Sequence, residues 1–189
     1  MKYTKEIKHK MMKACDSGKW SEIEPLLKEH GGDLAAAELI EGANALHWIS
    51  SRASDTAACG EAITQLFAAA GDAIDIDLPS GIQGYTAIHW ASMWGKVHHV
   101  RALLRCGASV DVKSKNGKTP TSICCEVSLC CEMRMCSKLN CTRKKKMNCT
   151  RKKKKQAILS LLKNPPPLYK SKNKKLNIKK EAVVKPIKH

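Results

Sequence analysis

Seven of the ten cysteines are crowded into one segment, where their thiols could bind metal or carry lipid. The pattern is CC-x4-CC-x4-C-x4-C-x7-C, from Cys124 to Cys149. Zinc sites typically use pairs separated by two residues, and the sequence contains no such pair. We therefore predict no metal and no other cofactor, with Cys124 and Cys125 in the core and the other five along an extended helix. Metal binding and palmitoylation beside the basic residues remain the alternatives.

The rest of the sequence shows no pattern typical of an active site. His98 and His99 are adjacent, so on a helix they point in different directions. The sequence has no glycine-rich phosphate loop, and no nucleophile is paired with a base in a recognisable context. We expect a protein that is not an enzyme.

The charge is distributed unevenly along the chain. Residues 1–139 hold 16 Lys/Arg against 16 Asp/Glu, whereas residues 140–189 hold 18 Lys/Arg against only Glu181. This pattern predicts a neutral folded body with a basic appendage whose partner is acidic. The sequence shows no signal-peptide pattern and does not spread its cysteines as a disulfide framework would, so we expect an intracellular, reduced protein.

Three segments share a pattern: GANALHWIS from Gly42, GYTAIHWAS from Gly84 and GKTPTSICC from Gly117. The last two are separated by 33 residues, a period typical of stacked helical repeats. The stretch GYTAIHWASMWGKVHHVRALLRCGASVDV closely resembles an ankyrin repeat, with Thr86-Ala87-Ile88-His89 in place of Thr-Pro-Leu-His. The resemblance implies an all-α ankyrin solenoid of about four helix–turn–helix pairs with β-hairpin fingers. It also implies that the motif histidines, His47 and His89, form hydrogen bonds between repeats.

The residues of the third repeat explain why it would fold in this way. Thr86 is a good N-cap for a first helix, which Gly95 ends. Val100, Leu103 and Leu104 have the spacing of the apolar face of a second helix. Gly107 then favours a left-handed C-terminal turn.

The repeat frame predicts a domain at residues 1–163 and a disordered Lys-rich tail at residues 164–189. The repeats are expected near residues 8–38, 39–80, 81–113 and 114–163.

Two repeats are longer than the 33-residue period. The second has nine extra residues, six of them expected between its helices in SRASDTAACG and three in its hairpin. The fourth fits only if about 25 extra residues near 129–153, rich in Cys and Lys, are inserted between its helices. We expect this insertion to be a loop.

The resemblance implies that the array docks a partner protein on its concave surface, through the hairpin tips and the exposed side of each first helix. The variable positions of the family correspond here to Ile82, Gln83, Tyr85, Met93, Trp94, Ser51, Arg52, Asn116, Lys118 and Glu126. Tyr85, Met93 and Trp94 are expected to form one apolar patch of residue types found at interface hot spots. The alternative is that Trp94 packs on the second repeat beside Trp48 and Trp90, which are themselves expected in the framework.

Residues 140–155, NCTRKKKMNCTRKKKK, repeat eight positions almost unchanged. A basic cluster of this density favours contact with a nuclear import receptor, nucleic acid or anionic lipid. The alternative is a solvated product of tandem duplication. The basic positions are Arg143, Lys144, Lys145, Lys146, Arg151, Lys152, Lys153, Lys154 and Lys155.

The segment after the last repeat contains a short motif. Pro166, Pro167 and Tyr169 fit the PPxY pattern that WW-domain proteins bind in a polyproline II conformation. A helix stop followed by a linker is the alternative.

Two classes of function stay open. The first is a noncatalytic module for protein–protein interaction, with the basic insert and tail for localisation or anionic contacts. The second is binding of nucleic acid or an anionic membrane, driven by the basic C-terminal region. We expect a monomer in the cytoplasm and the nucleus. Short ankyrin proteins with Lys-rich tails resemble effectors that intracellular bacteria secrete into host cells, but they also occur in eukaryotes and large viruses.

Overall fold

The computed structural model describes residues 3–124 and 141–168, and for residues 141–151 it describes the backbone alone. The predictions for Cys125, Cys130, Cys131, Cys136, Glu126, Tyr169 and the tail beyond residue 168 lie outside this part of the chain.

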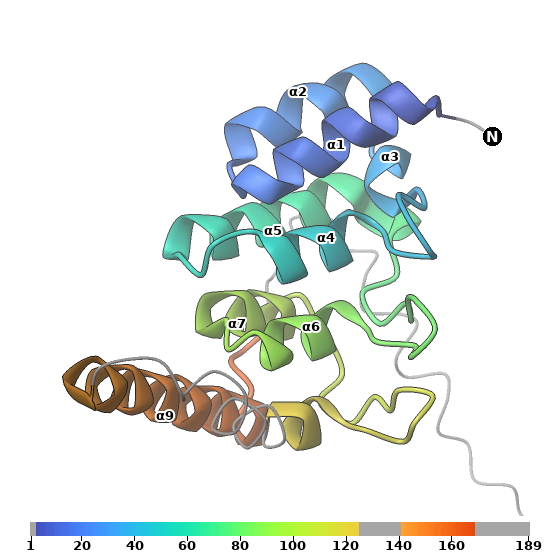
Figure 1. The fold of residues 1–189 in the computed structure, drawn as a ribbon. Helices are drawn as coiled ribbons and strands as arrows, with labels where there is room; N and C mark the ends of the chain where they lie inside the picture. Colours follow the sequence, from blue (N-terminus) through green and yellow to red (C-terminus); the bar gives the residue numbers. More distant parts are fainter. Residues whose placement is uncertain (1–2, 125–140, 169–189) are drawn as a thin grey trace, which may run out of the picture.

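The described helices follow one another in antiparallel pairs that stack into an array (Figure 1). Their bounds are α1 Lys5–Ser17, α2 Trp20–His30, α3 Asp33–Ala36, α4 Ala45–Arg52, α5 Ala57–Ala70, α6 Ala87–Met93, α7 Val97–Arg105 and α9 Cys141–Lys163, with a 3-10 turn η1 at Gly71–Ala73. Residues 120–124 are also helical.

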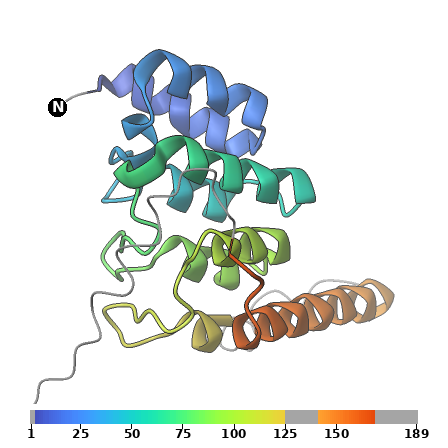
Figure 2. The ribbon, with the colours of Figure 1, turned by 180° about the vertical axis from the view of Figure 1, so that it is seen from behind.

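The helices form two layers. The first helices of the pairs, α1, α4 and α6, contact one another in one layer, and α2, α5, α7 and α9 form the other (Figures 1 and 2). The predicted all-α solenoid of helix pairs is confirmed. Within the described residues the fingers hold isolated antiparallel bridges, Ile40 with Ala43 and Ser80 with Tyr85, and no longer strands.

Apolar side chains at helical spacing hold the layers together. Val100 and Leu103 of α7 are fully buried, as the third-repeat pattern predicts. Ile158 of α9 is also fully buried, and Leu162 is nearly so, which makes α9 the second helix of a fourth pair. Burial of one such side chain contributes roughly 1.5–3 kcal/mol, so α9 is firmly attached to the array.

The extra residues of the second repeat do not form the loop that the repeat frame predicts. Only residues 53–56 separate α4 from α5, and α5 has 14 residues whereas α7 has 9. The extension is helical because Thr56 caps it: its side chain accepts a hydrogen bond from the Cys59 N–H at 3.2 Å.

The duplicated basic segment is also helical from Cys141 onward, so the prediction of a loop is wrong for this part of the insertion. Helix α9 runs without interruption from the basic residues into the buried apolar ones. Lys, Arg and Gln have high helix propensity, and the segment contains no glycine or proline. The N-terminal half of α9 projects beyond the ends of the neighbouring helices in both views (Figures 1 and 2).

Candidate protein-docking surface

The motif histidine of the third repeat contacts the fourth. Nε2 of His89 lies 2.9 Å from the Lys118 carbonyl oxygen, so this nitrogen carries a proton and donates it. Nδ1 then accepts from the Thr86 hydroxyl at 2.9 Å and the Thr86 N–H at 3.2 Å. The hydrogen bond between repeats that the resemblance implies is therefore present at His89, and His89 is structural.

His47 makes similar hydrogen bonds, but its Nε2 partner lies at the end of its own repeat. Its Nε2 lies 2.8 Å from the Leu78 carbonyl oxygen, and its Nδ1 accepts from the Asn44 N–H at 3.3 Å. Burial lowers the pKa of both histidines below the ordinary value, which favours this neutral form. In the fourth repeat Ser122 takes the place of the histidine, with its hydroxyl 2.9 Å from the Thr119 N–H.

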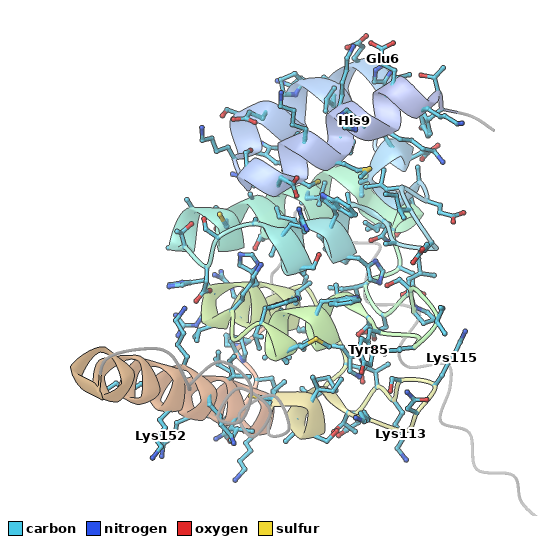
Figure 3. All side chains as sticks on the ribbon, in the orientation of Figure 1. Glu6, His9, Tyr85, Lys113, Lys115 and Lys152 are labelled. Carbon is cyan, nitrogen blue, oxygen red and sulfur yellow. The ribbon has the colours of Figure 1, made fainter. Side chains whose placement is uncertain are left out.

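Tyr85 does not belong to the exposed apolar patch that the sequence predicts. Only 6% of the residue is exposed. Its ring stacks on His89 with centroids 5.5 Å apart and meets Trp90 edge-on at the same distance. The aromatic ring completes the packing around the motif histidine, so Tyr85 belongs to the framework; Figure 3 labels it near the base of the finger at residues 80–85.

Trp94, in contrast, is 60% exposed, which favours the exposed patch over packing against the second repeat. It follows α6 directly, and Met93 before it is partly exposed. Ile82, at the tip of the adjoining finger, is 90% exposed, and Gln83 beside it is exposed as well. Large apolar side chains therefore remain accessible near both ends of α6, with Ile82 on the finger before the helix and Met93 and Trp94 at its C-terminal end. We call Met93 and Trp94 the apolar patch.

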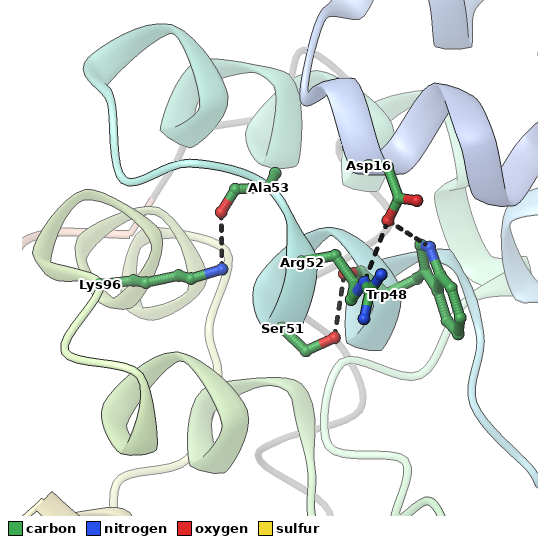
Figure 4. Close-up of polar contacts among 6 residues, drawn as sticks. All are labelled: Asp16, Trp48, Ser51, Arg52, Ala53 and Lys96. Atoms are coloured by element: carbon green, nitrogen blue, oxygen red, sulfur yellow. Dashed lines mark hydrogen bonds and ion pairs between the residues drawn. The ribbon is translucent and has the colours of Figure 1, made fainter. Parts of the chain in front are cut away.

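A polar cluster occupies the neighbouring repeat on the same layer of helices (Figure 4). Oδ1 of Asp16, in α1, accepts from Nε1 of Trp48 at 2.8 Å and from Nε of Arg52 at 3.4 Å. The Arg52 guanidinium lies 5.7 Å from the centroid of the Trp48 ring. The predicted contact residue Ser51 donates to the Trp48 carbonyl at 3.1 Å. Arg52 stays exposed, so the cluster both ties α1 to α4 and presents a cation.

The remaining predicted contact residues lie on the last finger. Asn116 is exposed and Lys118 is partly exposed. The fingers are joined by backbone hydrogen bonds, from Gly81 N–H to the Glu41 oxygen at 2.9 Å and from Lys115 N–H to the Gln83 oxygen at 3.0 Å. These links hold the finger tips in a fixed row.

The segment between α4 and α5 makes contacts that sequence reasoning did not find. Oδ1 of Asp55 accepts from the backbone N–H of His98 at 2.9 Å, in the first turn of α7. Oδ2 of the same carboxylate lies 2.9 Å from Nζ of Lys154 in α9. Lys96, the residue before α7, makes no side-chain cap, so Asp55 caps that helix from the preceding repeat.

Two further contacts attach the same segment to the third repeat. Nζ of Lys96 donates to the Ala53 carbonyl at 2.6 Å, and Nε2 of His99 donates to the Ser54 carbonyl at 2.9 Å. Burial lowers the pKa of His99 to about 4 and that of Lys96 to about 8. Burial alone would raise the pKa of Asp55, but hydrogen bonds from Lys154 and His98 outweigh it, so this pKa is lowered.

The described basic residues of α9 differ in their surroundings. Lys152 and Lys153 are exposed, and Lys152 points away from the other helices in Figure 3. Lys154 and Lys155 are partly buried. After α9, Pro167 and Leu168 are exposed and Pro166 is partly buried, so two of the three predicted WW-ligand residues lie in the described chain.

The four cysteines of residues 3–124, Cys15, Cys59, Cys106 and Cys124, are buried as small core residues. Burial raises the pKa of the Cys106 thiol to about 12. Over residues 3–124 and the described part of α9, no group of three or more His, Cys, Asp or Glu is placed to hold a metal ion. None of the described helices combines the length and the apolarity that a bilayer crossing requires.

The stacked helix pairs, the fingers and the motif histidines define a helical repeat protein of the ankyrin type. The family model of ankyrin repeats, in three copies, matches residues 11–114, which is more than half of the 189 residues. The chain belongs to the ankyrin repeat family. Ankyrin repeats are generally protein–protein interaction modules and are typically noncatalytic. No curated protein shows significant sequence similarity to the chain.

Proposed function

We propose that the protein is a noncatalytic module that docks a partner protein on the exposed side of its first helices and on its finger tips. The observation that carries the proposal is Trp94, whose indole is 60% exposed on a rigid helix pair. Tryptophan, arginine and methionine are enriched at protein interfaces, and tryptophan is frequent at hot spots. Exposure of such a side chain to water is unfavourable, and a partner that covers it gains the free energy of its burial.

The surroundings of Trp94 support the same proposal. Met93 precedes Trp94 directly and is partly exposed, and Arg52 is exposed at the end of α4. Ile82 and Asn116 are exposed on the fingers. Little ordering is required for binding, because the fingers are linked by backbone hydrogen bonds and the helices by the core. A preorganised surface of this kind loses little conformational entropy on association.

A substitution of Trp94 tests the proposal. Trp94→Ala should remove the captured partner, or weaken a measured Kd by tenfold or more on the scale of an interface hot spot. Leu168→Ala is the matched control, because Leu168 is 57% exposed but lies beyond α9. Proteins bound by the full chain and by the control, but not by Trp94→Ala, would support the proposal. If Trp94→Ala retained the same proteins with unchanged affinity and an unchanged thermal midpoint, the proposed surface would be wrong.

A further inference from the structure

The N-terminal half of helix α9 is strongly basic, and its C-terminal half packs against the array. Its 23 residues contain ten Lys or Arg and no Asp or Glu. The C-terminal half is fixed to the array by Ile158 and Leu162. The N-terminal half holds nine of the ten cations, and at about 1.5 Å per residue its 15 residues from Cys141 to Lys155 extend about 22 Å. The packed C-terminal half therefore holds the basic half of α9 in a fixed direction relative to the array.

The contact between Lys154 and Asp55 determines how the basic half of α9 is rotated. Lys154 faces the segment between α4 and α5, with Nζ 2.9 Å from the carboxylate. Lys152 and Lys153 are exposed to solvent. Successive residues of a helix are rotated by about 100° around its axis, so the four consecutive basic positions 143–146, in the projecting part of α9, are distributed around most of its circumference. A suitable partner must therefore present negative charge on more than one side of the helix.

This requirement distinguishes among anionic partners. A lipid surface contacts one side of a helix and stabilises it through an apolar face inserted below the headgroups. The basic half contains only Cys141, Met147 and Cys149 as apolar residues, so it has no such face. The major groove of B-form DNA is about 12 Å wide, admits one α-helix and has phosphates on both walls. The corresponding groove of A-form RNA is too narrow and deep for this contact.

We propose that the projecting half of α9 binds duplex DNA without sequence specificity, by lying along the major groove with its lysines and arginines directed to the phosphates of both walls. This inference goes beyond protein docking and does not depend on it. Trp94 and the basic helix lie on different elements, so one chain could hold a protein partner and DNA together. Loss of DNA binding would leave the docking proposal intact.

The first test is binding of the full chain to a mixed-sequence DNA duplex, measured by fluorescence anisotropy as a function of salt. The double variant Lys152→Gln/Lys153→Gln should bind more weakly, and the slope of log K against log salt should decrease by about 0.9 for each phosphate that the variant no longer neutralises. Lys5→Gln/Lys13→Gln is the control, because both lysines are exposed on α1 and the change in net charge is the same. Equal weakening by the two variants would overturn the proposal, since the charge of α9 would then have no special role.

A second test distinguishes the contribution of the helical conformation of α9 to DNA binding from the contribution of its charge. Thr150→Pro should interrupt α9 between the two runs of basic residues, 143–146 and 151–155, without changing its charge. It should weaken DNA binding, whereas a purely electrostatic tether would bind as before. Circular dichroism and the thermal midpoint would show that the array itself stays folded. Unchanged DNA affinity in a folded Thr150→Pro protein would overturn the helical groove contact.

Competing ligands complete the test. Duplex RNA of the same length, vesicles containing phosphatidylserine and an acidic peptide are compared with DNA at the same salt. The proposal expects DNA to bind most tightly. If vesicles, RNA or the peptide bound as tightly as DNA, α9 would be a general polyanion or membrane contact, and the proposal would be wrong.

Discussion

Asp55 and Lys154 lie 99 positions apart in the sequence and 2.9 Å apart in the structure, carboxylate oxygen to ammonium nitrogen. Asp55 belongs to the lengthened second repeat, and Lys154 to the duplicated basic segment. The two places where the chain departs from the regular repeat frame therefore contact each other. Because Asp55 also caps α7, this carboxylate joins the second, third and fourth helix pairs.

Asp55→Ala should lower the free energy of unfolding by about 1–2 kcal/mol, because it removes both the cap of α7 and the ion pair. Urea denaturation with the linear extrapolation measures this change. Asp111→Ala, at an exposed position, is the control and should change stability by less than about 0.5 kcal/mol.

Lys154→Gln removes the ion pair alone and should cost less, about 0.2–1 kcal/mol, since the lysine is half-exposed and its charge is screened by solvent. In a double-mutant cycle the two substitutions should not add, which would demonstrate the contact in solution. Additive effects would mean that Asp55 stabilises the protein through the cap of α7 only.

His99→Gln should reduce the loss of stability at acid pH. Burial lowers the pKa of His99 to about 4, whereas an unfolded histidine titrates near 6.5. Below pH 6.5 the unfolded chain binds a proton that folded His99 takes up only near pH 4. The free energy of unfolding therefore falls as the pH decreases through this window, by up to about 3 kcal/mol. Glutamine keeps an N–H donor for the Ser54 carbonyl but does not titrate.

The measurement for His99→Gln is the urea midpoint at several pH values between 7 and 4, compared with the original chain. The variant should show a shallower dependence on pH in this window. Parallel pH profiles would contradict the assignment, because the acid sensitivity would then come from other groups.

Gly18→Ala should destabilise the protein more than Gly95→Ala. Both glycines follow a helix end and have left-handed φ, 66° and 67°, so both substitutions incur similar backbone strain, about 1–2 kcal/mol. A Cβ at position 18 would lie 2.5 Å from Sγ of Cys59 and 2.9 Å from Cβ of Ala53, whereas a Cβ at position 95 meets no atom within 4 Å. The crowding should add roughly 1–3 kcal/mol. Thermal midpoints of the two variants give the comparison, and equal midpoints would contradict it.

Much of the fold follows from local patterns. The period of 33 residues, the apolar spacing of Val100 and Leu103 and the turn at Gly107 depend on neighbours within one repeat, so these features could be read from the sequence. The family match over residues 11–114 agrees with them. The candidate site was predicted less well: Trp94 is exposed as expected, but Tyr85 is buried. An aromatic residue beside a finger is equally suited to packing or exposure, and nothing local distinguishes the two.

The amino-acid sequence was sufficient for the repeat architecture and the position of the basic segment, because both rest on residue types at short and regular spacing. The hydrogen bond of His89 to the next repeat followed from the resemblance to the ankyrin family. The packing of the repeats on one another determined the remaining features. The burial of Tyr85, the cap that Asp55 places on α7 and the direction of α9 depend on side chains that meet only after the helix pairs have packed. Pairs separated by 43 or 99 residues, such as Asp55 with His98 and with Lys154, leave no trace in local periodicity.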